Sequence, residues 1–390
     1  MSKLDELIQK LCPDGVEYRK IGEVTNYEQP SKYIVRSTDY RDEYETPVLT
    51  AGQSFVLGYT DESDGIYPAA KTAPIIIFDD FTAAFKWVDF PFKVKSSAMK
   101  MITAKEDQLL IRFLFHWMGT LNYSSTEHTR LWIGTYSEFK IPVPPLPVQR
   151  EIVRILDNFT ELTAELTAEL TARKQQYAYY RDKLLTHSSE TKICKLSDVC
   201  ESIADGDHMP PPKADDGIPF ITISNITEQN KIDFSNTMFV PRSYYDALAD
   251  KRKPHSGDIL YTVVGSYGIP VCIEQDTKFV FQRHIAILRP RSEVIKARYM
   301  FHAMQSGAFK AQADKAAKGA AQKTIGLSSL AEMTLPVPDM CIQERLIRVL
   351  DNFDAICTDL NIGLPAEIEA RKKQYEFYRD KLLTFGERFN

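Results

Sequence analysis

The sequence lacks the features of an exported, membrane-spanning or disulfide-linked protein. No apolar run approaches the roughly 20 residues needed to cross a bilayer, and the charged, amphipathic stretch MSKLDELIQKL at its start is unlike a signal peptide. The six cysteines include no CxxC pair, and none stands at zinc-ligand spacing from a histidine. We therefore expect a soluble cytoplasmic protein with reduced thiols. Its 390 residues are enough for two domains with separate cores.

Signatures of the common nucleotide-dependent enzymes are also missing. GAAQKT (319–324) lacks the second glycine and the spacing of a phosphate-binding P-loop, and no GxGxxG follows an expected strand. MPPPK (209–213) lacks the acid or amide and the aromatic residue of the Asn/Asp-Pro-Pro-aromatic motif of base-amino methyltransferases. HExxH and GxSxG do not occur. We predict a chain without a catalytic centre, bound cofactor or metal site of its own.

Four residues resemble metal ligands only in type. Asp79 and Asp80 follow an expected strand, where acids commonly shape a turn, and we favour that role over a metal site. His208 lies in a turn-rich segment and His284 flanks an expected strand, so hydrogen bonding is the simpler interpretation of each.

An excess of positive charge is missing as well. The chain has 48 basic and 53 acidic residues, a net charge of −5. A protein that binds nucleic acid needs Lys and Arg to contact phosphates. If this chain binds DNA, local clusters of basic residues or a basic partner must supply the attraction.

What the sequence does contain is a long internal repeat. IPVPPLPVQREIVRILDNF (141–159) returns as LPVPDMCIQERLIRVLDNF (335–353), and ARKQQYAYYRDKLLT (172–186) returns as ARKKQYEFYRDKLLT (370–384). A variable globular segment and a helical segment therefore occur twice. The predicted divisions are 1–145, 146–187, 188–339 and 340–390.

The two repeated segments have the period of helices. Apolar residues recur at spacings of three, four and seven, and proline is absent from 148 to 187. A lone helix of this length cannot bury such a stripe, so we predict an antiparallel pair of helices in preference to helices that each pack only on their own domain. Gly363 and Pro365 predict a break, with Pro365 in the first turn after it. The residues expected to pair are Ile152, Leu156, Phe159, Leu162, Leu166, Leu170, Tyr177, Tyr180 and Leu184 with Leu346, Leu350, Phe353, Leu360, Tyr375, Tyr378 and Leu382, the second stripe also including Ile342, Val349, Ile356 and Ile368.

The globular segments show the pattern of mixed α/β domains. Apolar and β-branched runs between turn residues predict strands. The expected strands fall within 73–78, 217–223, 257–264 and 281–288, and the expected short helices within 107–120 and 293–306.

These motifs resemble the specificity subunits of type I restriction–modification systems. The resemblance rests on LDNF and RKxQYxxYRDKLLT, each after a PVP exit, and it covers the whole chain. It is similar to the variant with tetrapeptide repeats in the first helix, because two TAEL units (163–166 and 167–170) follow a truncated TEL (160–162). The second globular segment contributes IADGDHMPPPK (203–213), GDILYTVVGSYG (257–268) and FQRHIAILRP (281–290) to the resemblance.

The resemblance implies a pseudo-twofold protein in which two α/β target-recognition domains, separated by a long two-helix coiled coil, each read half of a split double-stranded DNA site. The helices would dock two modification subunits, which would carry S-adenosylmethionine and methylate adenine. Motor–nuclease restriction subunits would add ATP- and Mg²⁺-dependent translocation and cleavage. Partner subunits closing around the DNA would offset the acidic charge of this chain.

Base reading needs side chains that reach groove edges, and phosphate binding needs Lys, Arg, Ser and Thr. In the first domain the candidates, with Trp132 as a nearby aromatic residue, are Lys32, Lys71, Thr82, Lys86, Lys95, Ser96, Ser97 and Lys100. In the second they are His208, Lys213, Asn225, Ser266, Tyr267, Arg283, Lys318, Gln322 and Lys323. The basic cluster Lys251, Arg252 and Lys253 is more simply a solvated surface before a strand.

Two other classes of function remain open at this stage. A self-contained DNA enzyme would methylate or cut DNA as the purified chain, although the sequence contains no cofactor loop. A coiled-coil interaction scaffold without a DNA role explains the helices but not the two globular segments. The TAEL units, likewise, are good helix formers whether or not their number sets a distance.

Overall fold

The computed structural model describes residues 2–52, 54–105, 108–121, 123, 129–186, 191–206, 211–227, 229–319, 322–359 and 361–388. The chain forms two compact units: unit 1, Met1–Glu165 with Glu369–Asn390, and unit 2, Leu166–Ile368. Each unit combines one globular head with parts of both repeated helices. The units therefore cross the four divisions predicted from the sequence, because a head packs on helical segments from both repeats.

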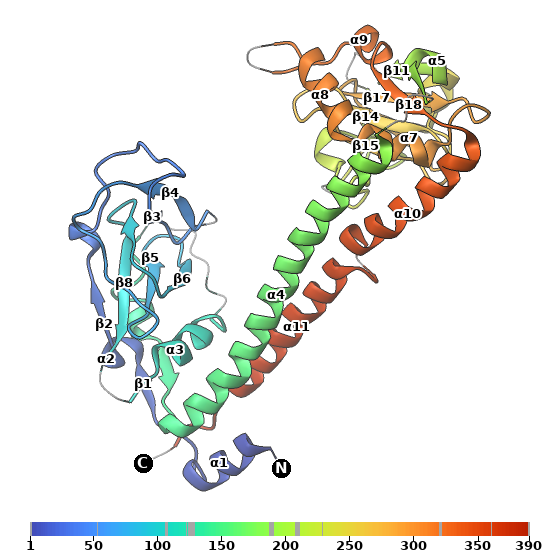
Figure 1. The fold of residues 1–390 in the computed structure, drawn as a ribbon. Coiled ribbons are helices and arrows are strands. Elements are labelled where there is room, and N and C mark those ends of the chain that lie inside the picture. The colour runs from blue at the N-terminus through green and yellow to red at the C-terminus, as the bar shows by residue number, and fades with distance from the viewer. Residues whose placement is uncertain are drawn as a thin grey trace. The chain divides into compact units, whose positions relative to one another are not determined.

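Head 1, the part of unit 1 before the long helix, contains a four-stranded antiparallel sheet with the order β2-β8-β5-β6. Beside it in the described residues are a three-stranded sheet, β4-β3-β7, in which β3 and β7 are parallel, and the pair β1-β9. The elements (Figure 1) are α1 (Lys3–Leu11), β1 (Tyr18–Lys20), α2 (Ile21–Val24), β2 (Thr25–Glu28), η1 (Pro30–Lys32), β3 (Thr46–Leu49), β4 (Val56–Thr60), β5 (Ile75–Asp79), β6 (Phe85–Val88), β7 (Lys93–Val94), β8 (Met99–Ala104), α3 (Ile111–Met118), η2 (Tyr136–Glu138) and β9 (Lys140–Pro142).

Head 2 repeats this topology strand for strand. Its sheets have the orders β11-β17-β14-β15, β13-β12-β16 and β10-β18, and β12 and β16 are again parallel. The elements are β10 (Lys192–Lys195), α5 (Leu196–Val199), β11 (Cys200–Asp205), β12 (Ile218–Ile221), η3 (Ile223–Asn225), β13 (Met238–Val240), α6 (Arg242–Ala247), η4 (Asp250–Arg252), β14 (Ile259–Thr262), β15 (Pro270–Cys272), β16 (Val280–Phe281), β17 (Ile285–Pro290), α7 (Ala297–Met304), α8 (Gly307–Ala316), α9 (Leu327–Ala331) and β18 (Thr334–Val337).

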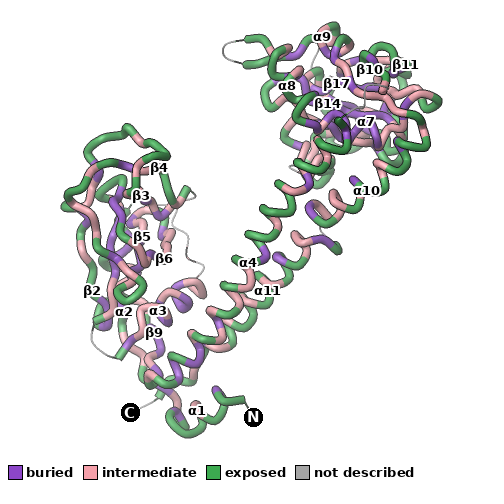
Figure 2. The backbone as a smooth tube through the Cα atoms, viewed as in Figure 1, coloured by how far each residue is buried: buried purple, intermediate pink, exposed green. Residues whose placement is uncertain are grey.

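The predicted short helices correspond to α3 and α7, and three of the predicted strands correspond to β5, β12 and β14, with residue 107 outside the described part. The prediction of a single strand over 281–288 is wrong, because the chain turns at 283–284 between β16 and β17. The run IIIF becomes β5, whose side chains from Ile75 to Phe78 are at most 2% exposed because the strand is central and covered on both faces. Its counterpart β14 is equally buried in head 2. Buried residues follow these strands in both units (Figure 2).

The repeated helices are α4 (Leu146–Leu185), α10 (Met340–Thr358) and α11 (Leu364–Leu382). The predicted break is confirmed, with Pro365 in the first turn of α11. A Cβ atom on Gly363 would lie 2.6 Å from the carbonyl oxygen of Ala355, so glycine is required where the chain turns between α10 and α11. No helix among the described residues is long and apolar enough to span a membrane.

The helices of the two repeats contact each other in both units. Phe159 of α4 stacks on Tyr378 of α11 in unit 1, with ring centroids 5.3 Å apart. In unit 2, Tyr177 and Tyr180 of α4 stack on Phe353 of α10, with centroids at 6.3 and 5.9 Å. An early residue of one repeat thus meets a late residue of the other, the pattern that antiparallel pairing produces.

Each helix also packs on a head. Ile152 and Leu156 are fully buried in the core of unit 1 with Phe113 of α3, and Leu350 is fully buried in the core of unit 2 with Met300 of α7. The two modes of packing that the sequence left as alternatives are therefore combined.

The predicted stripes need correction at the end of α4 and along one face of α10. Leu184 is 38% exposed, whereas its neighbour Leu185 is 7% exposed and joins the core of unit 2 beside Cys194, because the helix turns about 100° per residue and docks under β10. On α10, Ile342, Val349 and Ile356 are 43–45% exposed, since no described element of unit 2 covers that face. Leu360 lies outside the described residues.

Candidate nucleic-acid interface

Three loops meet at one end of the four-stranded sheet in head 1. The β5–β6 loop contacts the β7–β8 loop through the backbone hydrogen bond from Asp80 N–H to the carbonyl of Ala98, 2.8 Å. It contacts the segment before η2 through a second bond of 2.8 Å, from Leu131 N–H to the carbonyl of Asp80. We call this cluster, residues 80–84, 95–98 and 129–135, the three-loop end of head 1.

Head 2 makes the same two hydrogen bonds with the corresponding loops. Val263 N–H donates to the carbonyl of His284, and Ile325 N–H donates to the carbonyl of Val263, both at 2.8 Å. The three-loop end of head 2 is therefore residues 263–269, 282–284 and 322–326. A recess of about 350 Å³ opens there, and Arg283 and Gln322 are among the residues that line it. Two heads with unlike loop sequences thus present the same three loops at the same sheet end.

Most of the exposed predicted contacts fall in or next to these two clusters. Exposed side chains are what a surface that meets DNA requires, and these residues supply hydroxyl, amide and basic groups. In head 1 they are Thr82, Lys95, Ser96 and Ser97, and in head 2 they are Ser266, Arg283, Gln322 and Lys323, with Lys318 one β-bridge away at Thr324. Tyr267 is half-buried, and its hydroxyl donates to Asp314 at 2.9 Å.

Four predicted contacts lie elsewhere and one lies outside the described residues. Lys32 ends η1, with its ammonium 3.9 Å from Glu28, and Lys71 is in the turn before β5. Lys86 is in the middle of β6, and Lys213 precedes β12. His208 lies outside the described part of the chain.

The structure corrects two candidates. Lys100 is fully buried on β8, where its ammonium is 3.0 Å from a carboxylate oxygen of Asp80 and donates to Gln29 at 3.0 Å. Asn225 is 7% exposed, and its side chain is used within the head, where it accepts from Thr222 and donates to the carbonyls of Asp233 and Asn236. Both side chains are directed into their own head because strand and turn register, which composition does not reveal, places them there.

Asp79, the last residue of β5, shapes a turn as predicted, whereas Asp80 makes contacts with distant segments. Asp79 accepts hydrogen bonds from the backbone of Phe81 and Thr82, each 2.9 Å. Asp80, besides its pair with Lys100, accepts the backbone N–H of Trp132 at 2.8 Å. The described residues contain no cluster of metal-ligand type.

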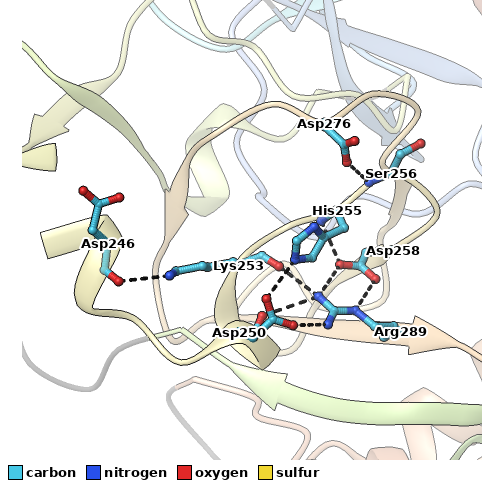
Figure 3. Close-up of polar contacts among 8 residues, drawn as sticks. All are labelled: Asp246, Asp250, Lys253, His255, Ser256, Asp258, Asp276 and Arg289. Atoms are coloured by element: carbon cyan, nitrogen blue, oxygen red, sulfur yellow. Dashed lines mark hydrogen bonds and ion pairs between the residues drawn. The ribbon is translucent and has the colours of Figure 1, made fainter. Parts of the chain in front are cut away.

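The basic cluster before β14 is tied to acids and carbonyls of its own head (Figure 3). Lys253 donates to the carbonyl of Asp246 at 3.0 Å. The nearby Arg289 bridges Asp250 and Asp258, and it also donates to the carbonyl of Lys253. This network braces the strand β17 against η4. Lys251 is exposed, as predicted for a solvated surface, whereas Arg252 and Lys253 are half-buried and contact Asp205 and Asp246 of the same head.

A polar cluster around a buried histidine joins each head to both repeated helices. In unit 1, His116 of α3 is fully buried. Its Nε2 is 2.9 Å from Asp157 of α4, and its Nδ1 is 2.9 Å from the hydroxyl of Tyr375 of α11. Arg112 donates to the same oxygen of Asp157 at 2.7 Å, and its guanidinium lies over the ring of Trp87, 4.6 Å from the centroid.

Unit 2 contains the same cluster. Nε2 of the fully buried His302 on α7 is 2.7 Å from Asp351 of α10, and its Nδ1 is 2.9 Å from the hydroxyl of Tyr177 of α4. Arg298 donates to Asp351 at 2.6 Å and to Asp354 at 2.7 Å. Burial raises the pKa of Tyr177 and Tyr375, so each hydroxyl keeps its proton. The carboxylate accepts from Nε2–H, which leaves Nδ1 to accept from the tyrosine.

A duplicated glutamine fixes the other side of each joint. Gln149 is fully buried near the start of α4, donates to the carbonyls of Pro144 and Gln108, and accepts from Leu110 N–H. Gln343 makes the equivalent bonds at the start of α10, to Pro338, Val294 and Lys296. The loop that enters α3 or α7 is thereby attached to the helix that leaves the same head.

The architecture has a recognised counterpart. The family model for the type I restriction modification DNA specificity domain matches this chain twice, over residues 13–173 and 188–370. The chain belongs to this family of specificity subunits.

Relatives agree over the full length. The EcoR124I/EcoR124II specificity subunit of Escherichia coli is 40% identical over 418 aligned residues, which cover 99% of this chain and 98% of the relative. A putative type I restriction enzyme specificity subunit of Haemophilus influenzae is 28% identical, with 95% and 96% covered.

Solved structures share the fold. The S subunit of a type I restriction-modification system from M. genitalium has a TM-score of 0.54 at 14% identity, covering 95% of this chain and 96% of its own. A chain from a study of complex assembly and conformational transition of the type I R-M system has a TM-score of 0.57 at 16% identity, covering 96% and 98%.

The residues of the buried joints were missed by the sequence predictions. Their signal is a third repeated motif, RFLFHWM (112–118) and RYMFHAM (298–304), in which Arg, Phe, His and Met recur at the same positions. Its short length hides it beside the long helical repeats. In this specificity subunit the motif supplies the histidine and arginine of each joint.

The histidines of the joints predict an acid-sensitive fold. Burial lowers the pKa of His116 and His302 below the 6.5 of a free imidazole, despite the carboxylate beside each. Since the unfolded chain takes up protons that the folded chain does not, stability is retained above pH 6.5. It falls below that pH by up to about 1.4 kcal/mol per pH unit for each histidine, until the lower folded pKa is passed.

This pH dependence can be measured as urea midpoints at pH 7.5 and 5.5. The three tryptophans, Trp87, Trp117 and Trp132, all belong to unit 1, so their fluorescence reports that unit. His116→Gln is expected to flatten the dependence in this signal. If the urea midpoint changes by the same amount between the two pH values in the variant and the parent, His116 is not the source of the acid sensitivity.

Proposed function

We propose that this specificity subunit recognises a split DNA sequence, each head reading one half through its three-loop end. The observation that carries the proposal is the convergence of the same three loops at the same sheet end in both heads, with different exposed side chains on each. A frame common to both heads, with polar loops that differ between them, suits two half-sites of unlike sequence. Exposed Arg283 can donate to O6 and N7 of guanine, and exposed Gln322 can donate to N7 and accept from N6–H of adenine, in the major groove.

We infer that the chain contributes recognition and no chemistry. In the part of the chain that the structure describes, the buried histidines contact the helices and Asp80 pairs with Lys100, so these polar groups have structural roles. S-adenosylmethionine would be carried by two modification subunits, and ATP with Mg²⁺ by motor–nuclease subunits. Methylation or cleavage by the purified chain alone would contradict this assignment.

The exposed face of α10 is the surface we propose for a modification subunit. Val148 on α4 is fully buried, and α1 is fixed near it by Lys3, whose ammonium is 2.9 Å from Glu151. The repeat aligns Val148 with Ile342, which is 43% exposed. Exposed large apolar side chains in a row on one helix face are typical of a surface that a partner covers.

Substitution of Lys323 by Ala tests the proposed interface. In the complex with its modification partners, we expect weaker DNA binding and a salt dependence, as the slope of log K against log salt, reduced by about one. Lys310→Ala on α8 is the matched control, because Lys310 is exposed but lies outside the three loops. Slopes that do not change in Lys323→Ala, or that change equally in both variants, would count against the interface.

A further inference from the structure

The two buried joints contain more polar chemistry than packing requires. A fully buried histidine, an aspartate, an arginine and a tyrosine recur in each unit with hydrogen bonds of 2.6–2.9 Å. Replacing buried polar groups with well-packed apolar ones is often neutral or stabilising, so stability alone is a poor reason for such a cluster. Hydrogen bonds, unlike apolar contacts, lose strength steeply when their angles change.

The members of each cluster come from three segments. The histidine and arginine are on the first helix after the sheet of a head, α3 or α7. The aspartate is in the LDNF motif of the same repeat. The tyrosine is in the RKxQYxxYRDKLLT motif of the other repeat: Tyr375 serves head 1 and Tyr177 serves head 2. A head is therefore joined at one point to both helices beside it.

Rotation of a head on the helices would break this chain of bonds. The tyrosine hydroxyl donates to Nδ1, and Nε2–H donates to the aspartate, so the imidazole is held from both sides in one tautomer. The arginine anchors the aspartate from the head side. Because His116 and His302 are fully buried, no water can replace a bond lost at the imidazole, whereas the aspartates are 28% and 38% exposed. A misalignment is therefore costly at the histidine.

We propose that the two His–Asp–Tyr clusters are orientation locks, in which the tyrosine of each repeat sets the angle of the other repeat's head and thereby the spacing at which the two half-sites are read. The part concerning DNA spacing rests on the proposed function. The assignment of Tyr375 to head 1 and of Tyr177 to head 2 does not rest on the proposed function, because it follows from the hydrogen bonds alone. Tyr177 and Tyr375 are positioning residues and contact no DNA base.

The first test is amide hydrogen exchange on the full chain carrying Tyr177→Phe or Tyr375→Phe, each of which removes a hydroxyl and keeps the ring. Tyr177→Phe is expected to speed exchange about tenfold in α7 while leaving α3 unchanged, and Tyr375→Phe to do the reverse, because a buried acceptor loses its donor. Tyr180→Phe and Tyr378→Phe are matched controls on the same helices, since these rings also stack on the LDNF phenylalanines but are 38% and 40% exposed. Faster exchange in the head of the same repeat, or no difference from the controls, would overturn the crossed assignment.

The second test measures methylation by the complex with modification subunits on a library of sites in which the spacer differs by one or two base pairs. The preference for the native spacer is expected to fall about tenfold in Tyr177→Phe and Tyr375→Phe, with both half-sites unchanged. A merely stabilising tyrosine would lower methylation at every spacer equally, and that result would overturn the lock. Wild-type chain that supports no site-specific methylation would instead sink the proposed function, while the exchange experiment would still decide the crossed assignment.

Discussion

Deleting residues 167–170 is expected to shorten the unread spacer between the two half-sites by one to two base pairs and to leave both half-sites unchanged. These four residues are one TAEL unit within the continuous helix α4, which begins in unit 1 and ends in unit 2. Four residues lengthen an α-helix by about 6 Å, and one base pair lengthens a DNA duplex by about 3.4 Å along its axis. They also turn the helix by about 40° beyond one full turn, so the apolar stripe continues across the deletion.

The measurement is methylome sequencing of a strain that expresses the deletion variant with its partner subunits. A length-preserving control replaces Thr167 and Glu169 by Ala and Gln. It removes the exposed ion pair between Glu169 and Arg173, 3.4 Å, and keeps the turn. If length is what matters, the control keeps the native spacer. An unchanged spacer in the deletion variant, or new bases in either half-site, would refute the prediction.

Substitution of Lys100 by Ala is expected to destabilise unit 1 by up to about 3–5 kcal/mol, because the buried carboxylate of Asp80 then keeps only the exposed guanidinium of Arg130, 3.9 Å away, as a charged partner. Lys100 and Asp80 are 0% and 1% exposed. Asp80 also holds the backbone of Trp132, so the loss reaches the three-loop end. Lys95 is exposed and directly follows β7. Lys95→Ala should therefore change the stability of unit 1 little and should weaken DNA binding instead.

Urea unfolding followed by tryptophan fluorescence reports unit 1 and provides the measurement for this pair of variants. Adding Asp80→Asn to Lys100→Ala should recover part of the lost stability, since the buried negative charge, which only Arg130 still faces, is then gone. Lys100→Ala with native stability and weakened DNA binding would show that this lysine meets DNA after all. The same variant therefore decides between the role predicted from composition and the role given by the fold.

The structure shows how many of the basic residues of this acidic chain are already paired within it. Many of its basic groups are already committed within the heads: Lys93 pairs with Glu62 at 2.8 Å, and Arg289 with Asp250 and Asp258. The number of Lys and Arg residues in a sequence therefore overstates what remains for phosphates. Under the proposed function, the exposed groups at the three-loop ends, together with partner subunits, would supply the attraction.

The sequence by itself determined the repeat, the two long helices, the break at Gly363 and Pro365, and the α/β character of the heads. These features are local or periodic, so neighbouring residues carry the information. The LDNF and RKxQYxxYRDKLLT motifs were also enough to predict the family, because their length makes chance recurrence negligible. What they could not give was the partner of each motif.

Only the tertiary structure decided which side chains are used internally and which are presented. Lys95 and Lys100 are five residues apart with the same chemistry, yet strand register exposes one and buries the other against Asp80. Tyr375 meets His116 across 259 positions of sequence, and no local pattern encodes such a contact. Long-range pairing is set by how sheets and helices pack in three dimensions, and for that reason the crossed joints and the three-loop ends became visible only in the fold.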